Sequence, residues 1–343
     1  MPEPLESARA DPSPSGVDHG PGPLLDAPGQ ADAPGPGPGP GDATTEEMAE
    51  FGVEVRSQWR LVLSRFLHHR LAVAGLMVLL VLVTVSFLGE TLSGYGYDEV
   101  PFDADAPLNS GPSTEHWFGT NELGVDVFSQ VQRGAQRSIQ VGFLIALFAT
   151  TFGSLVGAIA GFYRGWVDTV LMRFTDLFLT IPTLAVLIVV ANRFRDSENA
   201  WFAIVLVISA LAWMGLARIV RGVALSLRER EFVEAARAVG VSNRRIVVRH
   251  ILPNCLGPII VAGTLAMAGG ILAEAALSFL GFGIQPPDVS LGGLIAVGVP
   301  SADERWWLFY PPGLFILLFC LAINFIGDGL RDAFDPQQTR VRQ

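Results

Sequence analysis

The chain of 343 residues contains no lysine, and arginine supplies all 23 of its basic side chains. The phosphate-binding P-loop of ATPases needs a lysine, so this chain cannot hydrolyse ATP through that motif. A catalytic Schiff base on lysine is excluded for the same reason. Neither a Ser-His-Asp set nor an HExxH zinc motif is present. We therefore expect a protein that is not itself an enzyme.

Charged residues of any kind are also scarce. They make up 16% of the chain, against roughly 25% in soluble domains, while 50% of the residues are hydrophobic. The mean hydropathy is +0.42. Only two cysteines occur, Cys255 and Cys320, and both lie in apolar segments without a partner at metal-binding spacing, so we expect buried small side chains. This composition predicts a polytopic membrane protein.

The acidity of the chain is concentrated in residues 1–50. They carry ten acidic side chains and one arginine, a net charge of −9 out of −10. The segment is rich in proline and glycine and cannot bury enough apolar surface to fold, so we expect a disordered tail. It lacks the basic start and short apolar core of a signal peptide. At 51–70, arginines alternate with apolar residues at helical spacing, which predicts an amphipathic helix on the cytoplasmic membrane surface.

Six segments are apolar enough to cross a bilayer, which takes about 20 residues. They are 71–92, 138–162, 169–191, 201–222, 255–280 and 309–327. With both termini inside, the inner segments after residue 50 carry 17 arginines and the outer segments carry five. The positive-inside rule therefore predicts an all-α membrane protein with an N-in, C-in topology. The first outer loop, 93–137, is long, and a cytoplasmic tail follows at 329–343.

Several residues within the spans admit two interpretations. Glu274 either lines a translocation path or forms a structural pair with an outer arginine or Ser278. Asp176 and Arg173 are three residues apart, which favours an intrahelical pair. Pro182 predicts a kink in the third span, with or without a functional role.

Packing and interface patterns are also visible. Gly153, Gly157 and Gly161 have the GxxxG spacing of closely packed helices, either with a partner subunit or within this chain. The pair Trp306–Trp307 is typical of an interfacial aromatic belt. The histidines are isolated, or adjacent and facing apart on one helix, and we expect no metal site.

The largest inner loop, 226–253, contains a helix–glycine–helix pattern. Gly240 can end the first helix in a left-handed conformation, Ser242 can cap the second, and Pro253 can stop it. The apolar residues of the first helix are Phe232, Val233, Ala236 and Val239. An element with one apolar side and many arginines fits a groove on another protein.

This loop resembles the EAA loop of ABC importer permeases. The matching residues are Glu234, Ala235, Ala236, Gly240, Leu252 and Pro253. His250 departs from the general pattern but is frequent in the dipeptide and oligopeptide branch. Three further blocks resemble that branch, in the same order: His116–Thr120 with the residues up to Ala135, then Leu277–Pro287, then Asn324–Pro336. Within the first block, Val125 and Gln136 replace arginines that the branch usually has.

The resemblance covers about residues 55–337 and implies a type I ABC importer permease fold, with a core at 138–328. It implies a C-type permease of the dipeptide, oligopeptide or nickel family in the cytoplasmic membrane. The implied partners are a paralogous permease, two ATPase subunits docked under the loop, an external substrate-binding protein and the lipid bilayer. ATP and magnesium would bind the ATPase subunits, and this chain would hold no cofactor and bind no nucleic acid.

Two alternatives remain open. One is a permease for nickel or another small solute, because these branches share the motifs. The other is a secondary transporter that needs no ATPase and uses intramembrane acids or broken helices. For the second alternative, the sequence offers Glu274 and no obvious pair of broken segments.

Overall fold

The computed structural model describes residues 58–88, 91, 93–101, 107–194 and 200–334. The expected tail 1–50, the start of the 51–70 helix and the end of the C-terminal tail lie outside the described residues. Within the described part, every named element is a helix. The all-α prediction is confirmed.

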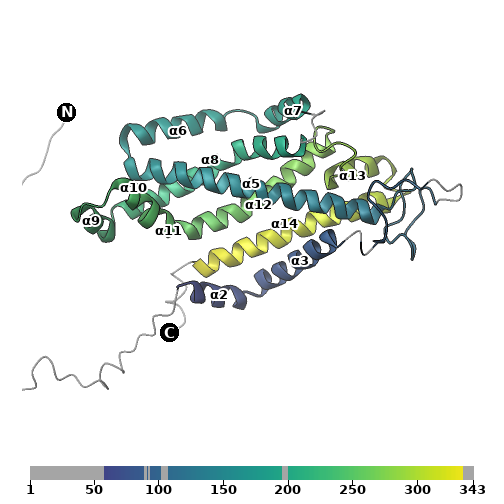
Figure 1. Cartoon of the computed structure of the whole chain (residues 1–343), viewed down its shortest axis with the longest axis horizontal. Helices are drawn as coiled ribbons and strands as arrows, with labels where there is room; N and C mark the ends of the chain where they lie inside the picture. Colours follow the sequence, from purple (N-terminus) through teal and green to yellow (C-terminus); the bar gives the residue numbers. More distant parts are fainter. Residues whose placement is uncertain (1–57, 89–90, 92, 102–106, 195–199, 335–343) are drawn as a thin grey trace, which may run out of the picture. The chain divides into compact units, whose positions relative to one another are not determined.

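Five helices are long and apolar enough to span a bilayer. They are α3 (Arg70–Phe87), α5 (Val127–Tyr163), α8 (Ala200–Arg228), α12 (Leu256–Phe279) and α14 (Trp306–Phe334). Figure 1 shows them running side by side. At 1.5 Å per residue, α5 is about 55 Å long, far more than the ~30 Å of hydrocarbon in a bilayer. Residues 127–137, expected in the outer loop, instead form its first turns.

The third expected span is a broken helix rather than a kinked one. Helices α6 (Gly165–Leu179) and α7 (Thr183–Arg193) meet at an angle of 78°. Pro182 lies immediately before α7, where its missing N–H costs no helical hydrogen bond. The proline therefore starts a new helix in a new direction.

The two ends of the described chain show that the number of crossings is even. Helix α2 (Gln58–His68) lies beside the last turns of α14 (Figure 1). His69 Nε2 lies 3.5 Å from a carboxylate oxygen of Asp332, and Arg65 donates to the Ala333 carbonyl oxygen at 3.5 Å. Five crossings would separate these ends, so the α6–α7 pair counts as the sixth. The described chain therefore begins and ends on one side, as the expected six-span topology requires.

Helix α6 is fastened to α8 by two ion pairs. Asp168 accepts from Nε and Nη2 of Arg221 at 2.5 and 2.7 Å. Asp176 accepts from Arg218 at 2.5 Å. The expected intrahelical pair of Asp176 with Arg173 is therefore replaced by a contact between helices, which spacing along one helix cannot reveal.

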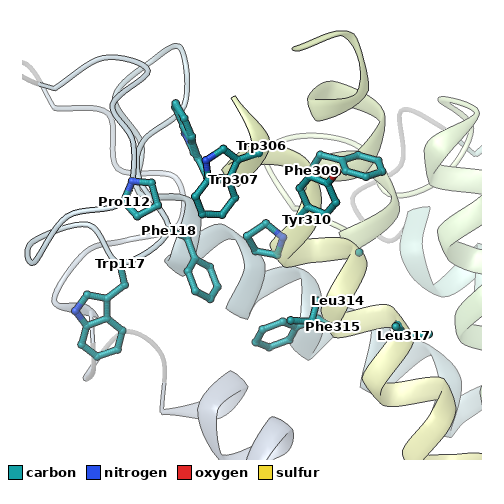
Figure 2. Close-up of a pocket in the computed structure, with 12 residues that line it drawn as sticks. Pro112, Trp117, Phe118, Trp306, Trp307, Phe309, Tyr310, Leu314, Phe315 and Leu317 are labelled. Atoms are coloured by element: carbon teal, nitrogen blue, oxygen red, sulfur yellow. The ribbon is translucent and has the colours of Figure 1, made fainter. Parts of the chain in front are cut away.

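Aromatic residues mark the outer end of the bundle. Trp306, Trp307 and Tyr310 of α14 face Trp117 and Phe118 of the outer loop across an apolar pocket of about 580 Å³ (Figure 2). Trp307 Nε1 donates to the Thr120 carbonyl oxygen at 3.2 Å, which ties the loop to the helix. Trp306 and Tyr310 stay largely exposed, as expected for a belt at the membrane surface.

The glycine spacing in α5 serves packing within this chain. A Cβ atom added to Gly153 would lie 2.7 Å from the Trp213 carbonyl oxygen of α8, and one added to Gly161 would lie 2.7 Å from Ala224 Cβ. At Gly157 the added atom would lie 2.9 Å from Val220 Cβ. These glycines therefore let α5 and α8 approach closely along one seam.

We predict that Gly157→Ala destabilises the chain by about 1–3 kcal/mol, because the added methyl group collides with the α8 backbone and side chains. The measurement is the thermal unfolding midpoint of the purified protein in detergent. Gly215→Ala in α8 is the matched control, since its Cβ would meet open space. An equal loss of stability at both positions would contradict the close packing of α5 against α8 at these glycines.

Candidate functional site

The inner loop forms a compact set of short helices. They are α9 (Glu231–Ala238), α10 (Asn243–Ile246), a π-helical turn (Val247–Ile251) and α11 (Leu252–Asn254). In Figure 1 they lie at one end of the long helices, and α11 leads into α12. The arginines of this loop mark that end as the cytoplasmic one.

Gly240 makes the turn between α9 and α10. Its φ is +79°, its N–H donates to the Arg237 carbonyl oxygen at 2.9 Å, and the Val241 N–H donates to the Ala236 carbonyl oxygen at 3.0 Å. This pair of hydrogen bonds is the Schellman motif, which satisfies the last carbonyls of a helix. A Cβ atom here would meet nothing within 4 Å, so backbone conformation alone selects glycine.

The structure modifies two details of the expected second helix. Ser242 occupies the N-cap position of α10, but its side chain makes no capping hydrogen bond. Pro253 does not stop the helix. The chain widens into the π-helical turn before it, where the Leu252 N–H donates to the Val247 carbonyl oxygen five residues back. Pro253 lacks an N–H group and lies at the start of α11, after the π-helical turn. The chain therefore continues past the proline into α12.

The underside of the loop is apolar and packs onto the long helices. Val233 and Ala236 of α9 are buried together with Ile246 and Ile251. They form one cluster with residues of α5 and α8, namely Ala158, Phe162, Leu216, Val220 and Ala224. Burial of each such side chain contributes about 1.5–3 kcal/mol for the larger residues. The loop is therefore a fixed part of the bundle.

Polar contacts hold the same junction. Arg228 Nη1 donates to the Phe162 carbonyl oxygen at 2.7 Å, and the Arg237 guanidinium lies 5.1 Å from the centroid of the Phe162 ring. Arg164, just after α5, pairs with Glu229 at 2.9 Å. These contacts connect the end of α5 to the end of α8, to Glu229 just after α8 and to the last turn of α9.

The outer surface of the loop carries apolar side chains without cover. Val239 is 79% exposed, Val248 56% and Phe232 40%. All three were expected in or beside the two short helices of the loop, and the structure leaves them exposed, whereas Val233 is buried. Exposed arginines accompany them, namely Arg244, Arg245 and Arg249. We call Phe232, Val239 and Val248 the exposed apolar face; such a group bordered by charges is typical of a protein-binding surface.

The six residues expected to couple to an ATPase all lie in this element. Glu234, Ala235, Gly240 and Pro253 are exposed, Leu252 is partly buried and Ala236 is buried. Their coupling role stays a prediction.

Glu274 lies in the outer half of α12 and is completely buried. Ser278 Oγ donates to its Oε1 at 2.6 Å, whereas Oε2 has no partner among the described residues. Helix α13 (Leu291–Gly298) packs beside it, since a Cβ atom on Gly292 would lie 2.7 Å from the Ala275 Cα atom. The sequence allowed two interpretations of Glu274, and a structural contact with Ser278 was one of them. A place on a translocation path stays a prediction.

The outer motif around His116 has a structural role in the fold. His116 Nδ1 lies 2.9 Å from Asp126 Oδ1, and Asp126 Oδ2 accepts from the Ser129 N–H at 2.8 Å. Asp126 thereby caps α5, where a negative charge is favourable. Gln136, at a position where the resembling branch has arginine, donates to the Ser86 carbonyl oxygen at 2.7 Å. Among the described residues, no group of three or more His, Cys, Asp or Glu side chains could hold a metal ion.

Sequence reasoning missed one outer cluster. Arg133 and Arg137 of α5 both contact Asp288, which follows α12 by nine residues. Their spacing of four residues places them on one helical face, and this was the available signal. The partner carboxylate lies 151 positions further along the chain from Arg137, which no local pattern reveals.

Comparisons with known proteins identify the family. Residues 153–340 match the binding-protein-dependent transport system inner membrane component, and residues 57–112 match the N-terminal TM domain of oligopeptide transport permease C. The chain belongs to this family of transport permeases. It is a multi-pass protein of the inner membrane, and the expected C-type permease resemblance is confirmed.

Similar permeases come from several bacteria. The oligopeptide transport system permease protein OppC of Mycobacterium tuberculosis (strain H37Rv) is 45% identical over 290 residues, which cover 84% of this chain and 98% of that protein. The dipeptide transport system permease protein DppC of Alkalihalophilus pseudofirmus is 38% identical over 284 residues, 82% of this chain and 90% of that protein. DppC of Bacillus subtilis is 38% identical over 283 residues, 82% and 85% of the two chains.

We predict that Val233→Ala lowers the stability of this permease by about 2 kcal/mol, because it removes buried methyl groups and leaves a cavity. Thermal unfolding in detergent measures the change. Val239→Ala in the same helix is the matched control and should change stability by less than about 0.5 kcal/mol, because its side chain is exposed. If both substitutions cost the same, the loop is not docked through its underside.

Proposed function

We propose that this chain is the permease subunit of an ATP-driven importer of dipeptides or oligopeptides. The observation that carries the proposal is the inner loop, whose underside is fixed to α5 and α8 while its exposed apolar face is left open by the residues that the structure describes. The names of the similar permeases, which mention oligopeptide and dipeptide transport, support the substrate class. A paralogous permease would supply the other half of the pathway.

The proposed mechanism is mechanical. Two ATPase subunits would bind ATP and magnesium, hydrolyse the ATP and hold the exposed apolar face in a groove. When they close, the loop would move as a rigid body, because its buried underside cannot slide without exposing apolar surface. The motion would pass into α5 and α8, whose glycine seam moves them together. An external binding protein would deliver the peptide to the outer side.

Uptake of a labelled dipeptide and a labelled tripeptide in cells that lack only this chain tests the function. Peptide uptake should fall and return when the intact gene is supplied. Nickel uptake, run in parallel, should not change. If nickel uptake falls while peptide uptake is unchanged, the chain is still a permease subunit, but its substrate is not a peptide.

The coupling loop gives a sharper prediction. Gly240→Ala forces a side chain into a left-handed conformation at a cost of about 1–2 kcal/mol and disturbs the turn between α9 and α10. We expect peptide uptake to fall at least ten-fold while the amount of protein in the membrane changes little. The readouts are initial uptake rates and immunodetection of the permease.

Gly165→Ala is the matched control for this variant. Gly165 also has a positive φ, +58°, and open space around it, but it is the first residue of α6, outside the coupling loop. It should retain most of the uptake. Equal loss in both variants would mean that backbone strain, and not coupling, explains the effect.

A further inference from the structure

An outer pocket of about 280 Å³ lies over the ends of α5 and α8. It is lined by Arg133 and Arg137 of α5, Trp201 of α8, Tyr97 of the first outer loop and Asp288. The pocket holds two guanidinium groups and one carboxylate, a net charge of +1. A pocket of this size suits a small group or one end of a longer ligand.

The two arginines are held in place from several sides. Arg133 Nε donates to Asp288 Oδ1 at 2.8 Å, and Arg137 Nε donates to the other oxygen. The Nη1 atoms donate to the amide oxygens of Gln136 at 3.3 Å and Gln140 at 3.0 Å. The guanidinium groups therefore need no reorganisation to receive a ligand.

Aromatic rings complete the support. The Arg133 guanidinium lies 4.8 Å from the Tyr97 ring centroid, and that of Arg137 lies 4.7 Å from the Trp201 ring centroid. Cation–π contacts of this kind stabilise the charged group without using its hydrogen-bond donors. They fix the planes of both arginines at the pocket wall.

Donors remain for a ligand. The hydrogen bonds above use two of the five N–H donors of each guanidinium. The Nη2 atoms have no protein acceptor among the residues that the structure describes. Asp288 is already engaged, since its Oδ1 also accepts from the Val289 N–H at 3.0 Å. One positive charge and a set of planar N–H donors are thus unsatisfied, and a carboxylate matches both.

We propose that this pocket binds the C-terminal carboxylate of the transported peptide on the outer side. The proposal rests on the peptide-import function above and adds a specificity-determining contact to it. Every peptide with a free C terminus carries this group, whatever its side chains, so the contact would suit a transporter that accepts many sequences. The pocket lies over α5 and α8, the two helices whose inner ends pack against the coupling loop.

The test compares uptake of one labelled tripeptide with its C-terminal amide, using the complete transporter and its binding protein in whole cells. Arg137→Gln should raise the KM for the free peptide roughly ten-fold, the effect of losing a charge-assisted hydrogen bond, and should leave the KM for the amide unchanged. Comparing permease variants with one binding protein cancels the binding protein's own preference. Arg133→Gln should act in the same way and serves as the second variant if Arg137→Gln accumulates poorly.

Arg305→Gln is the matched control, because Arg305 is an outer arginine in an ion pair with the exposed Glu122, outside the pocket. It should leave both KM values unchanged. An equal rise for both substrates in the pocket variants would overturn the carboxylate contact and assign the arginines to the binding protein or to the fold. Unchanged KM values would overturn it as well. If the intact transporter takes up neither peptide, the proposed function itself fails, and the inference falls with it.

Discussion

The packing of the inner loop against the ends of α5 and α8 is the contact on which the rest of the structure depends. The loop is short and rich in arginine, and its helices are too short to be stable alone. Burial of Val233, Ala236, Ile246 and Ile251 holds it in one conformation. Because this packing buries the underside of the loop, any contact with a partner must be made by the exposed apolar face.

The same contact makes α5 and α8 the route for movement in the proposed mechanism. Their glycine seam brings the two backbones close together over three successive turns. Helix α8 continues directly into the loop. At the inner end of α5, Phe162 contacts Arg228 and Arg237, and Arg164 pairs with Glu229. At its other end, α5 carries the outer arginine pair. One helix pair thus connects an inner docking surface to an outer pocket.

Much of this could be predicted from the sequence, since hydropathy and arginine placement depend on local composition. The six spans, the common side of the termini and the turn at Gly240 all follow from short windows of sequence. Contacts between distant segments could not be predicted. Asp176 pairs with Arg218 rather than Arg173, and Asp288 joins two arginines from α5, because tertiary packing decides such partners. Which apolar residues of the loop are buried against the bundle and which stay exposed was not predicted either, since periodicity identifies apolar residues without saying what covers them.

The most direct test of the account is cross-linking from the exposed apolar face in the assembled transporter. A benzophenone probe would be attached to Val239→Cys, with Ile246→Cys as the buried control; the native cysteines Cys255 and Cys320 are buried and would react little. The account predicts that illumination joins position 239 to an ATPase subunit, in a yield that changes when ATP is added, and that position 246 gives no such product. Cross-links from position 239 only to lipid or to the other permease would contradict it.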